Sequence, residues 1–215
     1  GFTPTVGRAS GTKLAAIADL AESVGSHRVR FTPHQKVLIL DVPPEKVDGV
    51  VAGMDELGFS ANPSVFRRYT MACTGIEYCK LSFADTRGRA QTLVPELEAR
   101  LGDLNADLDV PVTVNINGCP NSCARIQVAD IGLKGQVAKA ADGSDEFAFQ
   151  VHLGGGLASD ERDEAGLGRT VRGLKVLATE LPDYVERVVR TFAGARVDGE
   201  TFSEWVRRAD EEALR

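Results

Sequence analysis

The sequence has no long apolar run and no excess of positive charge, and both absences narrow its possible functions. No stretch approaches the ~20 consecutive apolar residues that a membrane-spanning helix needs, so no membrane association is expected. The 215 residues include 25 Lys and Arg against 31 Asp and Glu, which gives a net charge of -6. An acidic chain lacks the positive field that attracts nucleic acid, and we expect no nucleic-acid partner.

The start of the sequence carries no export signal. Its first residues, Gly1–Pro4, provide neither the basic region nor the apolar stretch of a signal peptide. A cytoplasmic location is therefore expected, in a reducing compartment where disulfides are rare. The sequence also does not begin with Met, so we expect a chain that is processed or cut from a longer protein.

Cysteine is scarce, and its few positions are the most informative feature of the chain. The only four cysteines form two close pairs, Cys73 with Cys79 and Cys119 with Cys123. Inert core cysteines rarely occur as tight pairs in Gly- and Asn-containing segments, so a metal centre is favoured over inert or disulfide-bonded cysteines. The first pair is wider than the roughly two to four intervening residues of structural zinc sites. Spacing alone leaves zinc and an iron–sulfur cluster both open.

The first part of the chain alternates helical and extended patterns. Apolar residues recur at helical spacing in two segments that flank two short β-type runs. The predicted helix, two strands and second helix are residues 11–24, 28–32, 36–42 and 44–57. This order predicts a small ferredoxin-like α+β unit over residues 1–63, because Asn62-Pro63 is typical of a boundary.

The remaining residues, 64–215, contain further strand and helix patterns. The predicted strands are 66–72, 110–116, 126–133 and 147–153, and the predicted helices are 91–102, 182–193 and 200–213. Gly154–Gly156 and Ser159–Glu164 are predicted to be loops. The first and second of these strands lead directly into the two cysteine pairs.

The two cysteine segments resemble the paired cluster signatures of the siroheme-containing sulfite and nitrite reductases. Cys73–Phe83 reads CTGIEYCKLSF and Asn117–Ala124 reads NGCPNSCA. Gly7–Gly11, Phe31–Gln35 and His152–Gly155 are further matches, in a form similar to that of ferredoxin-dependent enzymes from actinobacteria. The resemblance implies an α+β chain: a ferredoxin-like half-domain followed by the family's 4Fe–4S domain, with a mixed sheet and flanking helices.

The resemblance also implies the cofactors and the residues that bind them. Four thiolates, from Cys73, Cys79, Cys119 and Cys123, are expected to hold a [4Fe–4S] cluster. Cys123 is expected to be the catalytic bridge to the siroheme iron. The candidate siroheme-binding residues are Gln35, Asn117 and Asn121, although Gln35 also fits a solvated hairpin turn and the asparagines also fit simple turns. His152 is either a ligand or proton donor, or a structural histidine.

The function implied is that of an assimilatory enzyme that reduces sulfite to sulfide with six electrons from ferredoxin. The chain resembles only the C-terminal half of such an enzyme, so an N-terminal half is an expected partner, as is a small anionic substrate. Alone, the chain is expected to be inactive and to lose its iron on purification.

Three alternatives remain beside this hypothesis. The first is a nitrite reductase that forms ammonia. The second is a metal-free or zinc-holding scaffold that only docks to a partner, and the third is a small iron–sulfur electron carrier without siroheme. Cofactor content distinguishes the reductases from the scaffold and the electron carrier, because only the reductases require both an iron–sulfur cluster and siroheme.

Overall fold

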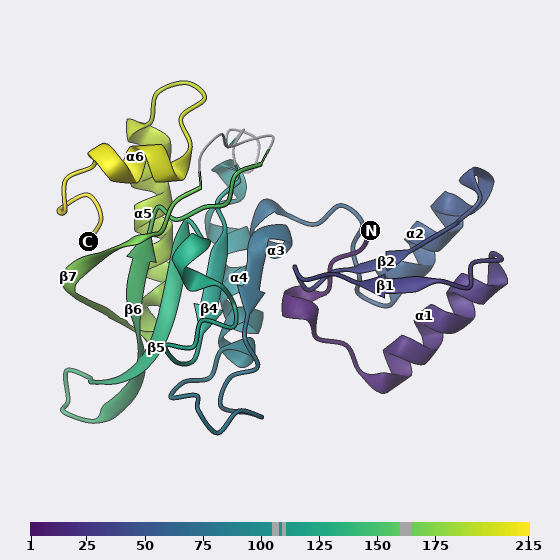
Figure 1. Ribbon diagram of the computed structural model, residues 1–215, viewed down its shortest axis with the longest axis horizontal. Helices are drawn as coiled ribbons and strands as arrows, with labels where there is room; N and C mark the ends of the chain where they lie inside the picture. The colour runs from purple at the N-terminus through teal and green to yellow at the C-terminus, as the bar shows by residue number, and fades with distance from the viewer. Residues whose placement is uncertain (105–107, 109–110, 160–164) are drawn as a thin grey trace. The chain divides into compact units, whose positions relative to one another are not determined.

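The computed structural model describes residues 1–104, 108, 111–159 and 165–215. It divides the chain into two compact units, Gly1–Arg68 and Tyr69–Arg215, a few residues beyond the boundary predicted at residue 63. Each unit is described by itself (Figure 1). No helix in the described part of the chain has both the length and the apolar content of a membrane span.

The first unit has the predicted helix–strand–strand–helix order. Its elements are the 3-10 helix η1 (Thr5–Gly7), α1 (Gly11–Ser23), β1 (Val29–Phe31), β2 (Val37–Ile39), η2 (Pro44–Lys46), α2 (Val47–Glu56) and the start of α3 (Val65–Tyr69). The Ser10 side chain caps α1 by accepting a hydrogen bond from Lys13 N at 3.2 Å. β1 and β2 pair antiparallel. The core is a small apolar cluster of Phe2, Ile17, Val37, Val50, Met54 and Phe59.

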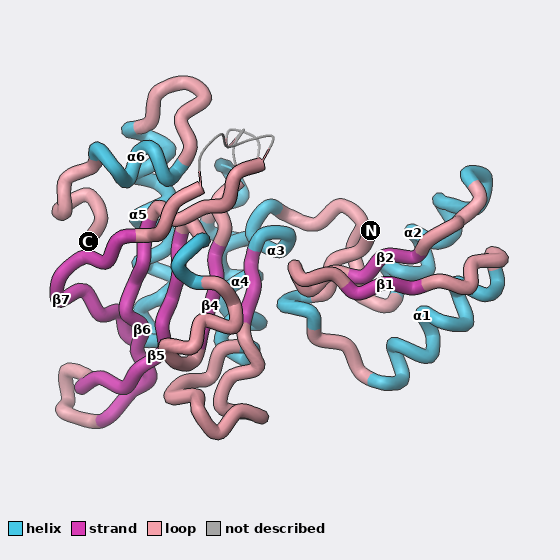
Figure 2. Tube along the Cα trace, in the orientation of Figure 1, coloured by secondary structure: helices cyan, strands magenta, loops and turns pink. Residues whose placement is uncertain are grey.

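The second unit is built on a five-stranded mixed sheet, as the resemblance implied. The strands are β3 (Thr70–Ala72), β4 (Val114–Asn117), β5 (Ile131–Lys139), β6 (Asp145–Leu153) and β7 (Arg169–Leu177), and they lie in sequence order across the sheet. β3, β4 and β5 are parallel, whereas β5, β6 and β7 are antiparallel. Figure 2 draws the strands in magenta and the helices in cyan. The α+β class and the mixed sheet are thereby confirmed.

Helices cover one face of this sheet. They are α4 (Arg87–Arg100) and α5 (Leu181–Ala195). α6 (Phe202–Arg208) packs on α5, and the short 3-10 turns are η3 (Gly102–Leu104), η4 (Ile126–Val128) and η5 (Ala178–Glu180). α4 and α5 contact each other, and both lie behind the sheet in Figure 1. Phe192 of α5 meets Phe202 and Trp205 of α6, with ring centroids 5.2 and 5.7 Å away. This aromatic cluster fixes α6 to α5.

Several local predictions were wrong. Residues 65–69 form helix α3, so the strand predicted at 66–72 begins only at Thr70. Residues 126–128 are a 3-10 turn, and the last helix ends at Arg208 rather than at residue 213. Residue 110 and residues 160–164, parts of a predicted strand and a predicted loop, lie outside the described residues.

Strand β7 was missed entirely. It is the edge strand of the sheet, and charged side chains interrupt its apolar pattern, which is how edge strands avoid pairing with other chains. Gly173 interrupts the strand with a φ of +75°. An interior glycine and a charged residue at every third position are typical of a loop, so the sequence pattern did not indicate a strand.

Replacing Phe192 by alanine tests the aromatic cluster. Phe192 has no exposed surface, so Phe192→Ala is expected to lower the free energy of unfolding by about 3–5 kcal/mol. Urea denaturation followed by circular dichroism measures this loss. Leu167→Ala is the control, because Leu167 is 76% exposed; equal losses in the two variants would contradict the assigned packing.

Candidate metal centre

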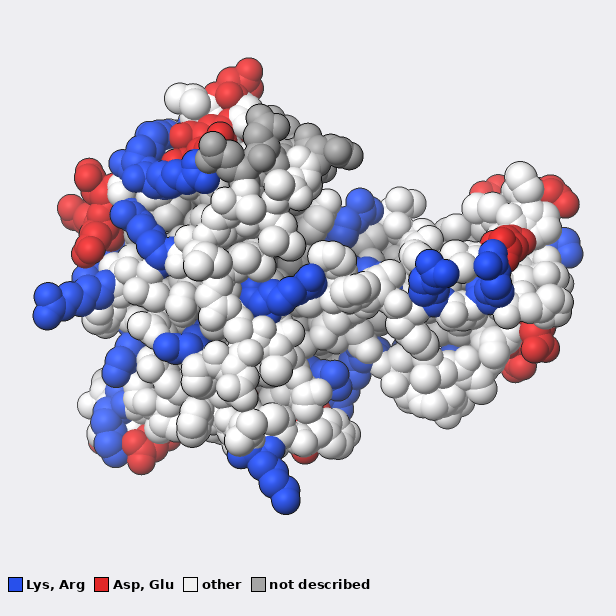
Figure 3. Space-filling model, viewed as in Figure 1, with Lys and Arg blue, Asp and Glu red and all other residues white. Residues whose placement is uncertain are grey.

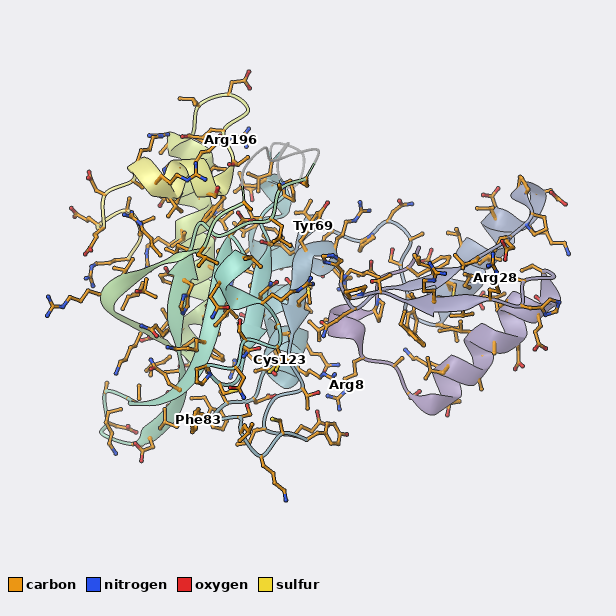
Figure 4. The ribbon with its side chains drawn as sticks, in the orientation of Figure 1. Arg8, Arg28, Tyr69, Phe83, Cys123 and Arg196 are labelled. Carbon is orange, nitrogen blue, oxygen red and sulfur yellow. The ribbon has the colours of Figure 1, made fainter. Side chains whose placement is uncertain are left out.

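The two cysteine loops meet because of the way β3 and β4 pair. Parallel strands place their C-terminal ends at the same edge of a sheet, and β3 and β4 are parallel neighbours. Cys73 directly follows β3, and its N–H donates to Ile116 O of β4 at 2.9 Å. Cys119 and Cys123 lie on the loop that follows β4, where Cys123 is labelled in Figure 4.

Backbone hydrogen bonds join the two loops into one structure. Phe83 N donates to Gly118 O at 2.8 Å, which links the end of the first loop to the start of the second. Within the first loop, Cys79 N donates to Gly75 O at 3.0 Å and Ile76 N donates to Ala84 O at 3.2 Å. Each loop therefore supports the conformation of the other.

Two glycines make this close packing possible. Gly75 has a φ of +72°, and a Cβ there would collide with Thr86 Oγ1. A Cβ at Gly118 would collide with Ser82 Oγ. No larger residue fits either position without moving the loops, so these glycines allow the two backbones to approach closely.

The sulfur of Cys73 accepts a backbone hydrogen bond and lies beside a hydroxyl group. Gly118 N donates to Cys73 Sγ at 3.3 Å. Thr86 Oγ1 lies 3.6 Å from the same sulfur and donates to Cys73 O at 2.7 Å. N–H groups aimed at sulfur are the arrangement that stabilises a thiolate ligand and tunes a bound cluster.

Thr86 was not recognised from the sequence. It immediately precedes α4, where threonine is typical of a helix cap. The structure gives it no capping bond and instead directs its hydroxyl to Cys73, with the whole residue buried. The sequence predicts a helix cap at Thr86, and only the fold shows that its hydroxyl binds Cys73 instead.

Asn117 holds the second loop in shape. Its Nδ2 donates to Cys119 O at 2.7 Å, and its Oδ1 accepts from Ala124 N at 2.8 Å. The side chain is completely buried, so its amide spans the segment that carries Cys119 and Cys123 rather than facing outward. This geometry favours the turn-holding alternative for Asn117, whereas Asn121 is exposed.

A second buried polar contact fixes the base of the site. Asp130 accepts hydrogen bonds from Thr113 N at 2.9 Å and Thr113 Oγ1 at 2.8 Å, and its own N–H donates to Thr113 Oγ1 at 2.8 Å. These residues stand just before β4 and β5. The contact sets how β5 lies against the strand that carries the second cysteine loop, and Asp130 is 1% exposed.

The four thiols differ in their access to solvent. Cys119 is buried, Cys73 and Cys79 are half-buried and Cys123 is exposed, and all four are free. Among the described residues, no three His, Cys, Asp or Glu side chains converge on a point that fits one metal ion. A [4Fe–4S] cluster takes one thiolate for each iron, so its ligands do not need to converge on a single metal ion. Four thiols on two joined loops, one of them facing an N–H donor, fit such a cluster.

The first cysteine loop exposes large apolar side chains. Ile76, Tyr78, Leu81 and Phe83 are between 48% and 72% exposed, and Phe83 lies on the same end of the sheet as Cys123 in Figure 4. On the face drawn in Figure 3, the described Lys and Arg side chains form small separate groups with uncharged surface between them. Several large apolar side chains exposed on one short loop are typical of a binding surface.

The remaining candidate residues lie elsewhere. Gln35 is in the first unit, in the β1–β2 turn with a φ of 59°, whereas the cysteines are in the second unit. His152 is on β6, opposite Gly132 and Thr170. Its Nε2 is buried without a hydrogen-bond partner in the described structure, and burial, followed by the charge of Lys134, lowers the pKa of this histidine. The imidazole is therefore disposed to be neutral.

Two family models together match most of the chain. Residues 66–215 match the nitrite and sulphite reductase 4Fe-4S domain, and residues 1–57 match the nitrite/sulfite reductase ferredoxin-like half domain. The chain belongs to the nitrite and sulphite reductase 4Fe-4S domain family. Membership of a 4Fe-4S family supports an iron–sulfur cluster.

Individual relatives agree. The chain is 60% identical to sulfite reductase [ferredoxin] 1 of Mycolicibacterium paratuberculosis over all 215 residues, which cover 38% of that protein. It is 31% identical to the assimilatory ferredoxin-dependent nitrite reductase of Haloferax mediterranei, with 100% of this chain and 35% of that protein covered. The chain thus spans less than half the length of these relatives.

Two solved structures are similar to this chain. The structure of the Mycobacterium tuberculosis NirA protein matches with a TM-score of 0.95 and 58% identity, and the match covers 100% of this chain and 38% of that one. Dissimilatory sulfite reductase I matches with a TM-score of 0.72 at 14% identity, over 99% of this chain and 67% of that one. The second match shows a shared fold alone.

Removing the Asn117 amide tests its role in the second loop. Asn117→Ala leaves Cys119 O and Ala124 N without partners in a buried site, which is expected to cost about 1–3 kcal/mol for each group left unsatisfied. Urea denaturation and hydrogen exchange at the Ala124 amide measure this effect. Asn121→Ala is the matched control, and the assignment fails if the exposed asparagine matters as much as the buried one.

Proposed function

We propose that this chain supplies the cluster-binding part of a ferredoxin-dependent sulfite reductase. The observation that carries the proposal is the junction of the two cysteine loops at the ends of β3 and β4, with Gly118 N–H directed at Cys73 Sγ. Identity of 60% to a sulfite reductase [ferredoxin] over the whole chain supports the same conclusion.

In this proposal the four cysteines, Cys73, Cys79, Cys119 and Cys123, hold a [4Fe–4S] cluster. The Gly118 N–H offsets negative charge at Cys73 Sγ, and the Thr86 hydroxyl holds Cys73 through its carbonyl oxygen. The buried Asn117 amide keeps Cys119 and Cys123 in position. When bound, the cluster and siroheme supply the redox chemistry that no side chain provides. Cys123, the most exposed thiol, is the proposed bridge to the siroheme iron.

Siroheme has many carboxylates, and the proposal assigns them partners. Gln35 and the exposed Asn121 are the proposed amide donors, while Asn117 acts by positioning the second loop. The apolar side chains around Phe83 are proposed to be covered by the macrocycle or by the N-terminal half of the enzyme, because exposed apolar surface of this kind favours association.

Sulfite is the proposed substrate and nitrite the alternative. Identity is 60% to a sulfite reductase but 31% and 34% to two nitrite reductases. The proposed partners are the N-terminal half, ferredoxin and the small anion. Because the chain covers 38% of the sulfite reductase, the isolated chain is proposed to be inactive and prone to lose iron in air.

Anaerobic reconstitution with iron and sulfide tests the cluster assignment. The 215-residue chain is expected to bind about four irons and four sulfides, measured by iron and acid-labile sulfide analysis. Each of Cys73→Ser, Cys79→Ser, Cys119→Ser and Cys123→Ser is expected to lower this content, whereas Ser144→Ala, in an exposed turn, is the control. Zinc bound without sulfide would instead support the scaffold hypothesis.

Turnover of the complete parent enzyme tests the substrate. With reduced ferredoxin as donor, kcat/KM for sulfite is expected to exceed that for nitrite by about tenfold or more, which corresponds to about 1.4 kcal/mol of transition-state stabilisation. Siroheme absorption is measured in the same preparation and is expected to be lost in Cys123→Ser. A cluster without siroheme in the unaltered enzyme would favour the electron-carrier hypothesis, and a preference for nitrite would reverse the substrate assignment.

A further inference from the structure

One side chain lies beside a cysteine sulfur in the candidate metal centre. Thr86 Oγ1 is 3.6 Å from Cys73 Sγ, within the reach of a hydrogen bond to sulfur. Among the described residues, no other side chain lies within hydrogen-bond distance of any of the four cysteine sulfurs. The remaining donor at Cys73 Sγ is the backbone N–H of Gly118, at 3.3 Å. The groups that face its sulfur therefore distinguish Cys73 from the other three cysteines.

Thr86 also supports the turn between the first two cysteines. Its hydroxyl donates to Cys73 O at 2.7 Å. A Cβ at Gly75 would collide with Thr86 Oγ1, so the backbone of the turn packs directly against this hydroxyl. Cys79 N donates in turn to Gly75 O at 3.0 Å. Thr86 thus contacts the segment that carries both cysteines of the first pair.

The position of Thr86 in the fold keeps its side chain in place. Thr86 immediately precedes α4, and Ala90 N of α4 donates to Thr86 O at 2.9 Å. Neither Thr86 nor Ala90 has exposed surface, and α4 packs against β3, the strand that Cys73 follows. A side chain packed this closely has already lost its rotamer freedom, so presenting Oγ1 to Cys73 costs little further entropy when a group binds.

The Thr86 hydroxyl has one proton and two acceptors within reach, Cys73 O and Cys73 Sγ. A thiol can donate to Thr86 Oγ1 while the hydroxyl donates to Cys73 O. A sulfur bound to iron has no proton, so it can only accept. Because hydrogen bonds to a charged acceptor are roughly twice as strong as those between neutral groups, an iron-bound Cys73 favours rotation of the hydroxyl toward its sulfur. This rotation moves no heavy atom.

We propose that Thr86 is a positioning residue for the iron–sulfur cluster, and that its hydroxyl stabilises the negative charge on Cys73 that increases when the cluster gains an electron. The proposal rests on the proposed function, because it requires the cluster. Hydrogen bonds to the sulfurs tune the potential of a cluster, and a donor that stabilises the reduced form raises it. Gly118 N–H is the fixed donor at this sulfur, and Thr86 is a second donor that turns to the sulfur when iron is bound.

Redox titration of the complete parent enzyme, followed by electron paramagnetic resonance of the reduced cluster, tests this role. Thr86→Val removes the hydroxyl at nearly constant volume. It is expected to shift the ratio of reduced to oxidised cluster about tenfold toward the oxidised form, which for one electron lowers the midpoint potential by about 59 mV. Thr86→Ser keeps the hydroxyl and is expected to keep the potential. Thr92→Val is the control, because Thr92 is exposed on α4 and its hydroxyl donates to Arg89 O.

Thr86→Ala is a second variant without the hydroxyl, for the case that valine does not fit beside Gly75. Iron and acid-labile sulfide are measured in every variant, and circular dichroism measures folding. Loss of the cluster from folded Thr86→Val and Thr86→Ala, but not from Thr86→Ser, supports the same role for the hydroxyl. The proposal is overturned if loaded Thr86→Val or Thr86→Ala keeps the unaltered potential, or if Thr86→Ser shifts the potential equally. Absence of a cluster from the unaltered enzyme overturns the proposed function as well, so the two failures are distinguishable.

Discussion

The parallel pairing of β3 with β4 is the constraint on which the candidate metal centre depends. The two cysteine pairs are far apart in sequence, and neither loop alone carries four thiols. α4 crosses between the two strands, and a connection of this length is what parallel neighbours require. Once the strands are parallel, their following loops must share an edge, and Phe83 N–H and Gly118 O then lock them together.

Buried polar contacts stabilise the part of the sheet that carries the cysteine loops. Asp130 and Thr113 join the starts of β4 and β5, while Asn117 spans the loop at the opposite end of β4. Buried polar groups stabilise a structure only when they are fully partnered, and they then specify one arrangement. The second cysteine loop thus follows a strand, β4, that is held by buried polar contacts at its start and at its end. Preorganised ligands of this kind favour one geometry of the bound group.

The sequence could predict the elements that rest on local pattern. Helices α1, α2, α4 and α5 were expected from apolar residues at helical spacing, and the cysteine pairs were expected in Gly- and Asn-containing segments that follow strands. Thr86 and Asp130 could not be predicted, because their roles depend on residues distant in sequence. Strand β7 was missed because the charges that protect a sheet edge are also typical of loops. Asn117 was found as a candidate, but only the fold distinguishes its turn-holding role.

Charge at the cysteine loops is balanced by the backbone rather than by a charged side chain. The Gly118 N–H faces the Cys73 sulfur, which carries negative charge when it binds a metal. The Thr86 hydroxyl donates to Cys73 O, so it holds this cysteine in place. Gly118 reaches the sulfur because the two loops are joined at the ends of β3 and β4. The parallel pairing of these strands therefore positions both the cysteines and the donor that faces one of them.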